Sequence, residues 1–445
     1  MKIIYSAADA KASLLKRSLP EWQETSSELK QKMREVFGGD LTLREAVERI
    51  LEEVRTKGDT ALFDYAKQLD GVELRELEVG REELAQARTR VSGELISALE
   101  LAAQRIKAFH LNCKRRSWVD FGEGGLGQWV RPLAKVGVYV PGGRASYPST
   151  VLMTAIPAKV AGVREVIMAT PPGEGGVSPA TLVAAEIAEV DRVFQIGGAQ
   201  AIGAMAFGTQ SIPKVDMICG PGNIFVQLAK RMLYGTVDID GFYGPTETMI
   251  LADETADPAI CAADLLAQAE HDVMASAILI TTSTELAGAV SREVECQIVE
   301  LGRKEIITAS LEDKGGIVVV SDLEEAIELI NGYAPEHLSV MVKDAWSCAE
   351  KIQNAGGVFI GEDAPEVVGD YSAGPSHVMP TGGTAWFSSP LTAEDFLKVT
   401  SVIALDGKTL RAIGPAAATI ARSEGLDAHA RSVERRLAKI EKRRL

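Results

Sequence analysis

The chain contains five histidines, and four of them lie in short polar clusters that could perform chemistry. In the first cluster, Gln268 and His271 are three residues apart at the end of an apolar-periodic run. If that run is a helix that begins after Asp257, a suitable N-cap residue, both side chains project from one face. An amide oxygen and an imidazole nitrogen can then bind one divalent ion such as zinc or manganese, if other segments supply two more ligands. Alone the pair is a weak signal, because similar residues at helix ends usually face solvent.

A carboxylate and an imidazole adjoin in the second cluster, where Glu336 and His337 follow a proline and precede a strand-like run. A turn before a strand is a suitable place for proton transfer by such a pair. The two remaining clusters carry one histidine each, His377 in 369–377 and His429 in 424–429. The fifth histidine, His110, shares a helical face with apolar neighbours, so we interpret it as structural.

The composition argues against several classes of partner. The 445 residues include 47 Lys and Arg against 62 Asp and Glu, which gives a net charge of −15. Such an acidic chain is unsuited to nucleic acid or an anionic membrane as its main partner. No apolar run approaches the roughly 20 residues of a membrane helix, and the first residues do not resemble a signal peptide. Five widely spaced cysteines without a CxxC motif predict reduced thiols in a cytoplasmic protein.

Two series of alternating strands and helices predict the elements that position these clusters. The first series has strands at 136–140, 165–169, 192–196 and 215–219. The second has strands at 249–251, 277–281, 316–320, 338–342 and 357–360. Such alternation is typical of parallel sheets covered by helices on both faces. From about residue 392 the alternation ends, and we predict a mostly helical tail whose basic end is a solvated helix.

The strands of the first series end in glycine-bearing turns, at 141–143, 172–173, 197–200 and 220–223. In open parallel sheets, ligands bind at the carboxyl ends of the strands, where such turns let backbone amides approach a pyrophosphate. Each turn alone is more simply a tight connection, but four in register make a nucleotide site an open alternative. Residues 122–127 match GxGxxG, yet no buried strand precedes them, so we reject them as a dinucleotide fingerprint.

Eight short stretches together resemble the histidinol dehydrogenase family. They are 139–143, 197–201, 220–223, 239–247, 263–271, 334–337, 369–371 and 424–429. The resemblance covers essentially the whole chain. It implies oxidation of L-histidinol to L-histidine through the aldehyde in two NAD-dependent steps, at the end of histidine biosynthesis.

The same resemblance implies a role for each matching residue. The zinc ligands would be Gln268, His271, Asp370 and His429, with His429 supplied by the partner subunit of an intertwined homodimer with composite active sites. The acid/base pair would be Glu336 and His337. The NAD contacts would be Tyr139, Gln200 and Asn223. The substrate would touch the four ligands and His337, together with Thr246, Glu424 and His377.

The predicted fold is α/β, with two Rossmann-like parallel-sheet domains and helical N- and C-terminal extensions. The N-terminal extension is expected at 1–30 and the C-terminal tail at 392–445. The first α/β domain is expected to combine 31–135 with 248–391 and to carry the catalytic and metal residues. The second, on the NAD side, is expected at 136–247.

Three residues depart from the family pattern. Tyr243 replaces a usual alanine, Trp386 a common arginine and Ser376 a common asparagine. Two of these are large aromatic residues expected near the site, which leaves an alternative open. That alternative is a paralogous zinc- and NAD-dependent dehydrogenase of another small alcohol, such as a sulfonated diol. The presence of both Glu424 and His429 favours histidinol.

Overall fold

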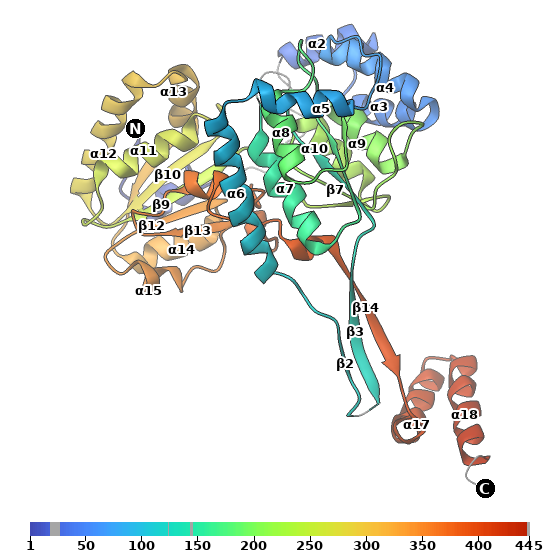
Figure 1. Ribbon diagram of the computed structural model, residues 1–445. Helices are drawn as coiled ribbons and strands as arrows, with labels where there is room; N and C mark the ends of the chain where they lie inside the picture. The colour runs from blue at the N-terminus through green and yellow to red at the C-terminus, as the bar shows by residue number, and fades with distance from the viewer. Residues whose placement is uncertain (18–26, 123, 143–145, 443–445) are drawn as a thin grey trace. The chain divides into compact units, whose positions relative to one another are not determined.

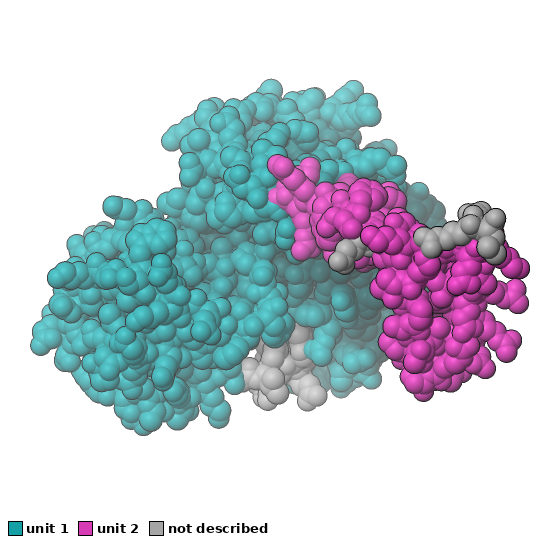
Figure 2. All heavy atoms as spheres, turned by 90° about the horizontal axis from the view of Figure 1, so that it is seen from below, with its two compact units in different colours: residues 1–113, 133–396 teal, residues 114–132, 397–445 magenta. Residues whose placement is uncertain are grey.

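The structure is a computed structural model that describes residues 1–17, 27–122, 124–142 and 146–442 (Figure 1). They form two compact units, coloured separately in Figure 2: unit 1 is Met1–Cys113 with Leu133–Phe396, and unit 2 is Lys114–Pro132 with Leu397–Leu445. Four predictions extend beyond the described residues, namely part of the N-terminal extension, Glu123 of the GxGxxG match, Gly143 of the first glycine turn and the last three residues of the C-terminal tail. No helix among the described residues is long and apolar enough to cross a membrane.

Unit 1 contains a five-stranded parallel sheet with the order β6-β5-β4-β7-β8. Its strands are β4 (Lys135–Tyr139), β5 (Glu165–Ala169), β6 (Arg192–Phe194), β7 (Met217–Cys219) and β8 (Asp238–Ile239). The connecting helices are α7 (Pro148–Ala161), α8 (Pro179–Ile187), α9 (Gly198–Phe207) and α10 (Ile224–Leu233). Numbered along the chain, the strand order is 3-2-1-4-5, which matches five of the six strands of a Rossmann sheet.

The second sheet of unit 1 has six parallel strands in the order β1-β11-β10-β9-β12-β13. They are β1 (Ile3–Ile4), β9 (Glu247–Ala252), β10 (Ser276–Thr281), β11 (Gly316–Val319), β12 (His337–Met341) and β13 (Gly357–Ile360). The helices are α1 (Ala7–Ala12), α11 (Pro258–Ala269), α12 (Thr284–Gln297), α13 (Lys304–Asp313), α14 (Leu323–Tyr333), α15 (Ala345–Ala349) and α16 (Glu366–Tyr371). Without the edge strand β1, the order is again 3-2-1-4-5.

Alternate residues of the six-stranded sheet face two different cores. Met249 and Leu251 pack with α14 and α1, whereas Ile250 and Ala252 pack with α11, α12 and α13. Both faces are therefore covered, which explains why β9 is apolar along nearly its whole length. The predicted α/β fold with parallel sheets is confirmed.

The helices that precede the first sheet pack against it. They are α2 (Ser27–Phe37), α3 (Leu43–Lys57), α4 (Asp59–Tyr65), α5 (Arg81–Ala87) and α6 (Gly93–Asn112). Ile50 and Leu62 share one core with Ile167 and Ile202 of the five-stranded sheet and its helix α9. These helices therefore lie on the sheet expected to bind NAD, whereas the predicted boundaries grouped 31–135 with the other sheet. The domain boundaries as a whole stay a prediction.

Unit 2 is a three-stranded antiparallel sheet followed by a helical hairpin (Figure 1). The strands are β2 (Trp118–Asp120), β3 (Gly125–Pro132) and β14 (Leu397–Ala404), and the helices are α17 (Gly407–Ser423) and α18 (Asp427–Lys442). Gly127 lies so close to the Trp118 carbonyl that no side chain would fit there, which gives the rejected GxGxxG run a role in strand pairing. Strand β14 lies within the tail predicted to be mostly helical. All eight of its residues, four of them β-branched, pair with the eight residues of β3.

Candidate active site

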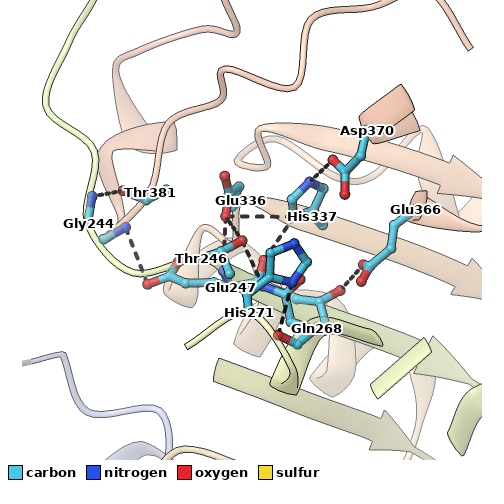
Figure 3. Close-up of polar contacts among 12 residues, drawn as sticks. Gly244, Thr246, Glu247, Gln268, His271, Glu336, His337, Glu366, Asp370 and Thr381 are labelled. Atoms are coloured by element: carbon cyan, nitrogen blue, oxygen red, sulfur yellow. Dashed lines mark hydrogen bonds and ion pairs between the residues drawn. The ribbon is translucent and has the colours of Figure 1, made fainter. Parts of the chain in front are cut away.

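The residues predicted to transfer protons, Glu336 and His337, lie at the amino end of β12, beside the amino end of the neighbouring strand β9. Glu247 begins β9 and His337 begins β12, and His337 lies opposite Thr248 in the sheet register. Helix α11 connects two parallel strands and so runs in the opposite direction. Its C-terminal end therefore brings Gln268 and His271 to the same edge of the sheet (Figure 3).

The Glu336 carboxylate is held by two hydrogen bonds. Its Oε2 accepts a hydrogen bond from Thr246 Oγ1 at 2.5 Å and another from the Glu247 amide at 3.0 Å. Gln268 Nε2 in turn donates to Thr246 Oγ1 at 2.8 Å. The side chain of Glu336 is buried, and burial raises its pKa to about 7, although His337 and these hydrogen bonds oppose the shift. A carboxyl group with this pKa can exchange a proton near neutral pH.

His337 is fixed between a backbone carbonyl and two carboxylates. Its Nδ1 lies 3.3 Å from the Glu247 carbonyl and 3.7 Å from Glu336, and its Nε2 lies 3.4 Å from Asp370 Oδ1. Burial lowers the pKa of the imidazole, but Glu336 and Asp370 outweigh that effect and raise it to about 10. The Nδ1 proton is thereby directed at the carbonyl, which leaves Nε2 as the nitrogen that can exchange protons.

Three of the four residues predicted to bind zinc meet at this edge. His271 Nδ1 lies 3.1 Å from its own helix carbonyl at Ala267, so its Nε2 is available as a ligand. The amide nitrogen of Gln268 is used by Thr246, which leaves the amide oxygen to face an ion. His337 lowers the pKa of Asp370 against the opposing effect of burial, so that carboxyl is ionised, as a ligand must be.

The fourth predicted ligand, His429, belongs to α18 of unit 2. Among the described residues, no group of three or more His, Cys, Asp or Glu side chains is arranged to hold a metal ion. Unit 1 supplies three of the predicted ligands. Gln268 is an amide, so only His271 and Asp370 count toward such a group. The donor set nevertheless fits zinc, which accepts oxygen and nitrogen ligands in a tetrahedral arrangement.

Sequence reasoning missed one acid beside the site, Glu366 at the start of α16. It is buried and accepts a hydrogen bond from Thr248, whose backbone lies opposite His337. Burial raises the pKa of Glu366 to about 7 against the opposing effect of His337. No sequence signal distinguishes this acid, because it begins an ordinary short helix and follows no motif.

The predicted NAD contacts line one cavity of about 1440 Å³ at the carboxyl edge of the five-stranded sheet. Tyr139 ends β4, Gln200 lies in the first turn of α9, and Asn223 is the N-cap of α10. Both amide atoms of Gln200 are buried without a hydrogen-bond partner. Buried polar groups are rarely left unpaired, so this amide is suited to a ligand in the cavity.

Neighbouring groups fix the other two contacts. The hydroxyl of Tyr139 accepts a hydrogen bond from the Gly198 amide at 3.1 Å. Asn223 Oδ1 accepts from the amides of Phe225 and Val226, which leaves its side-chain NH₂ group for the cavity. The helix N-terminus that Asn223 caps favours a phosphate. The four glycine-bearing turns thus contribute to one site, as the nucleotide interpretation requires.

The remaining predicted substrate residues are divided between the units. His377 Nδ1 lies 2.9 Å from the Asp370 carbonyl, and its Nε2 lies 3.4 Å from Thr150 of α7, so it joins the edge of the site. Glu424 and His429 are exposed residues of unit 2, at the C-terminal end of α17 and near the start of α18.

The three departures from the family pattern have separate surroundings. The Tyr243 ring packs over Lys230 Nζ at 5.0 Å, beside the buried Lys230–Asp240 ion pair, and does not join the Glu336–His337 cluster. Ser376 Oγ donates to the Met153 carbonyl and is structural. Trp386 is 57% exposed, and nothing in the structure explains its presence.

Comparison with known proteins decides between these interpretations. Residues 38–437 match the family model for histidinol dehydrogenase. The chain belongs to the histidinol dehydrogenase family. It is 50% identical to histidinol dehydrogenase of Dehalococcoides mccartyi strain CBDB1 over 440 residues, 98% of this chain and 100% of that protein. Identity to the Deinococcus radiodurans enzyme is 48%, over 98% of this chain and 99% of that one.

The crystal structure of histidinol dehydrogenase from Elizabethkingia anophelis has the same fold. It is 35% identical, superposes with a TM-score of 0.91, and the match covers 99% of both chains. The predicted family is confirmed, and the chain is an oxidoreductase that acts on an alcohol and its aldehyde. The alternative substrate, a sulfonated diol, gains no support from these relatives.

Proposed function

We propose that this chain oxidises L-histidinol to L-histidine through the aldehyde, with NAD as oxidant and with zinc at the amino edge of the six-stranded sheet. The observation that carries the proposal is the convergence of Gln268, His271 and Asp370 beside the Glu336–His337 pair. The free state of all five cysteines fits a reducing compartment such as the cytoplasm.

NAD is supported by the cavity at the carboxyl edge of the other sheet. Gln200 supplies an unpaired buried amide, and Asn223 supplies an NH₂ group at a helix N-terminus. Bound NAD would accept the hydride in each of the two oxidations. The role of the protein here is to orient the dinucleotide.

Zinc would be held by Gln268, His271 and Asp370, with His429 as the fourth ligand. When bound, zinc would orient the substrate by contacting the imidazole and amino nitrogens of histidinol. Ligation by Asp370 would also offset one of the three carboxylate charges, with Glu336 and Glu366, that raise the pKa of His337. The imidazole would then be neutral, and able to accept a proton, at lower pH.

His337 would take the hydroxyl proton of the alcohol on Nε2 as the hydride leaves the carbon. Glu336 would accept a proton from the water that adds to the aldehyde. His337 would then take the proton of the hydrate in the second oxidation. The hydrogen bonds from Thr246 and Glu247 fix the carboxylate for this role.

The predicted role of His429 as a ligand from the partner subunit requires an intertwined homodimer with composite sites. Unit 2 exposes several large apolar side chains on its strands and helices, among them Trp118, Trp129, Ile403, Ile413 and Ile420. Apolar surface on this scale indicates a protein partner. Mixing inactive His271→Ala and His429→Ala subunits should restore part of the activity, because one of the two composite sites then carries neither change. Exchanged heterodimers without activity would contradict shared sites.

The decisive assay measures NADH formation with L-histidinol against a panel of other small alcohols and sulfonated diols. We expect turnover with histidinol alone, lost on removal of zinc by a chelator and restored by added zinc. NAD binding should persist in the zinc-free protein, because its cavity uses other residues. Full activity of the metal-free protein, or preference for a diol, would contradict the proposal.

A further inference from the structure

Arg17 lies near the start of the chain, yet its guanidinium group reaches the edge of the sheet that carries the proton-transfer residues. It forms a bidentate pair with Glu247, at 2.5 Å from Nη1 to Oε1 and 2.8 Å from Nη2 to Oε2. The same group donates to the backbone carbonyls of Tyr333 at 2.8 Å and Ala334 at 3.2 Å. Its central carbon lies 3.8 Å from the Tyr333 ring centroid. The guanidinium therefore binds β9 and the end of α14 together.

The residue paired with Arg17 holds both members of the proton-transfer pair through its backbone. The Glu247 amide donates to Glu336, and the Glu247 carbonyl lies 3.3 Å from His337 Nδ1. A shift of the Glu247 backbone would therefore move the carboxylate and the imidazole at once. The Glu247 side chain is 9% exposed, so without Arg17 its charge would be buried and unpaired, which is costly.

The second segment held by Arg17 has a strained backbone directly before the pair. Ala334 has a φ of +54°, and it is one of only two non-glycine residues with positive φ in the part of the chain that the structure describes. A side chain in this region costs about 1 kcal/mol or more, so surrounding contacts must maintain it. Arg17 binds the carbonyl of Ala334, and the Gly356 amide donates to the Pro335 carbonyl. The turn that presents Glu336 is thus held from two sides.

We propose that Arg17 is a positioning residue for catalysis, which sets the Glu336–His337 pair through Glu247 and the Ala334 turn. This inference rests on the proposed function, because it assumes that the pair transfers protons. Arg17 contacts neither member of the pair directly. A planar guanidinium is required for the role, since a lysine cannot satisfy a bidentate carboxylate and two carbonyls at once.

Arg192 is a matched control at the other sheet. It also forms a bidentate pair, with Glu78, donates to the Ser211 carbonyl, and lies 4.8 Å from the Phe194 ring centroid. Its contacts resemble those of Arg17 but lead to no proton-transfer residue. Replacing either arginine removes a similar set of bonds, but Glu78 is 42% exposed and Glu247 only 9%, so Arg192→Ala should also cost less stability.

The experiment compares Arg17→Ala, Arg17→Lys and Arg192→Ala in the full-length, zinc-loaded enzyme. For Arg17→Ala we expect kcat of both oxidations to fall about 10²-fold, the loss typical of a displacement near 1 Å. KM for NAD and zinc content should stay within about threefold of the wild type. Arg17→Lys should recover less than a tenth of the lost rate, whereas guanidinium ion added to Arg17→Ala should recover part of it. Arg192→Ala should keep its kcat.

Equal kcat losses in the Arg17 and Arg192 variants, or a lowered melting temperature with unchanged kcat in Arg17→Ala, would overturn the inference. If Arg17→Ala does not fold, Arg17→Lys decides, because full activity in that variant also contradicts the geometric role. A parallel His337→Asn variant tests the proton-transfer role of the pair separately from the positioning role of Arg17. If His337→Asn loses activity but the Arg17 variants keep theirs, only the positioning role is rejected. Full activity of His337→Asn would reject the proton-transfer assignment itself.

Discussion

The two parallel sheets of unit 1 share the strand order 3-2-1-4-5 but use opposite edges. The five-stranded sheet has its cavity at the carboxyl ends of the strands, where open α/β sheets usually bind ligands. The six-stranded sheet gathers Thr246, Glu336 and His337 at the amino ends of its strands. The same topology therefore supports two kinds of site, and the polar residues at each edge decide which edge is used.

At the carboxyl edge of the six-stranded sheet, one side chain bridges two neighbouring strands. Asp253 follows β9 and accepts hydrogen bonds from Thr255 and from the backbone amide of Lys343, which follows β12. One carboxylate thus joins the two strands at the point where the strand order reverses. At the corresponding end of the other sheet, Tyr139 and Asn223 line a cavity that can hold a ligand. A Rossmann-like order alone is therefore not evidence of a nucleotide site.

The largest effect should come from the amino edge. His337→Asn keeps a polar side chain of similar size but cannot take the proton, so both oxidations should slow by about 10²–10⁴. In the wild type, kcat/KM should rise with pH, because carboxylates raise the pKa of His337 and only the neutral imidazole accepts a proton. The measurements are the two half-reactions, each started from its own substrate, and their pH profiles. NAD binding and zinc content serve as controls.

Glu336→Gln in the same assays tells the two residues of the pair apart. We expect aldehyde oxidation to suffer more than alcohol oxidation, because only the aldehyde must first add water. Small and equal losses in both halves, for both variants, would show that this edge is a structural turn and that the base lies elsewhere.

A smaller effect is expected at the carboxyl edge of the other sheet. Gln200→Leu replaces a buried amide without partners by an apolar side chain of similar size, so the free protein should keep or gain about 1 kcal/mol of stability. KM for NAD should rise about tenfold while zinc content stays constant. Thermal unfolding with and without NAD measures both quantities. Unchanged NAD affinity would exclude Gln200 from the cofactor site.

The smallest effect is expected at the border between the two sites. Tyr243→Ala removes a ring that packs on the Lys230–Asp240 pair, outside the Glu336–His337 cluster. KM for histidinol should change less than about threefold, with a loss of stability of about 1–2 kcal/mol. Steady-state kinetics with histidinol and a diol check this. A switch of substrate preference would show that the ring reaches the substrate.

The central strands of both sheets and the edge strands β6 and β13 could be predicted from the sequence, but the edge strands β1 and β8 could not. Strands such as β5 and β10 are continuous apolar runs between helices, and that pattern has few alternatives. The edge strand β1 contains only Ile3 and Ile4, too few residues to show a period. Strand β14 was missed because the antiparallel partner that stabilises it precedes it by more than 260 residues.

Most site residues were predicted from the resemblance to the family motifs and few from residue spacing. Gln268 and His271 could be grouped from helical spacing, but nothing in the spacing joins them to Asp370, a hundred residues later. Glu366 and Arg17 were missed for a related reason. Each is an ordinary charged residue locally, and its role arises only from burial and from partners distant in the chain.

The pairing of the first residues with distant strands has a consequence for the order of folding. Ile3 pairs with Ile317, and Arg17 binds Glu247 and the Ala334 carbonyl. Domains generally fold from the N-terminus as the chain leaves the ribosome, but these contacts have very high sequence separation. Residues 3 to 17 must therefore wait for partners synthesised more than 200 residues later. We expect the five-stranded sheet to fold during synthesis, and the proton-transfer edge to form only when most of the chain has been released.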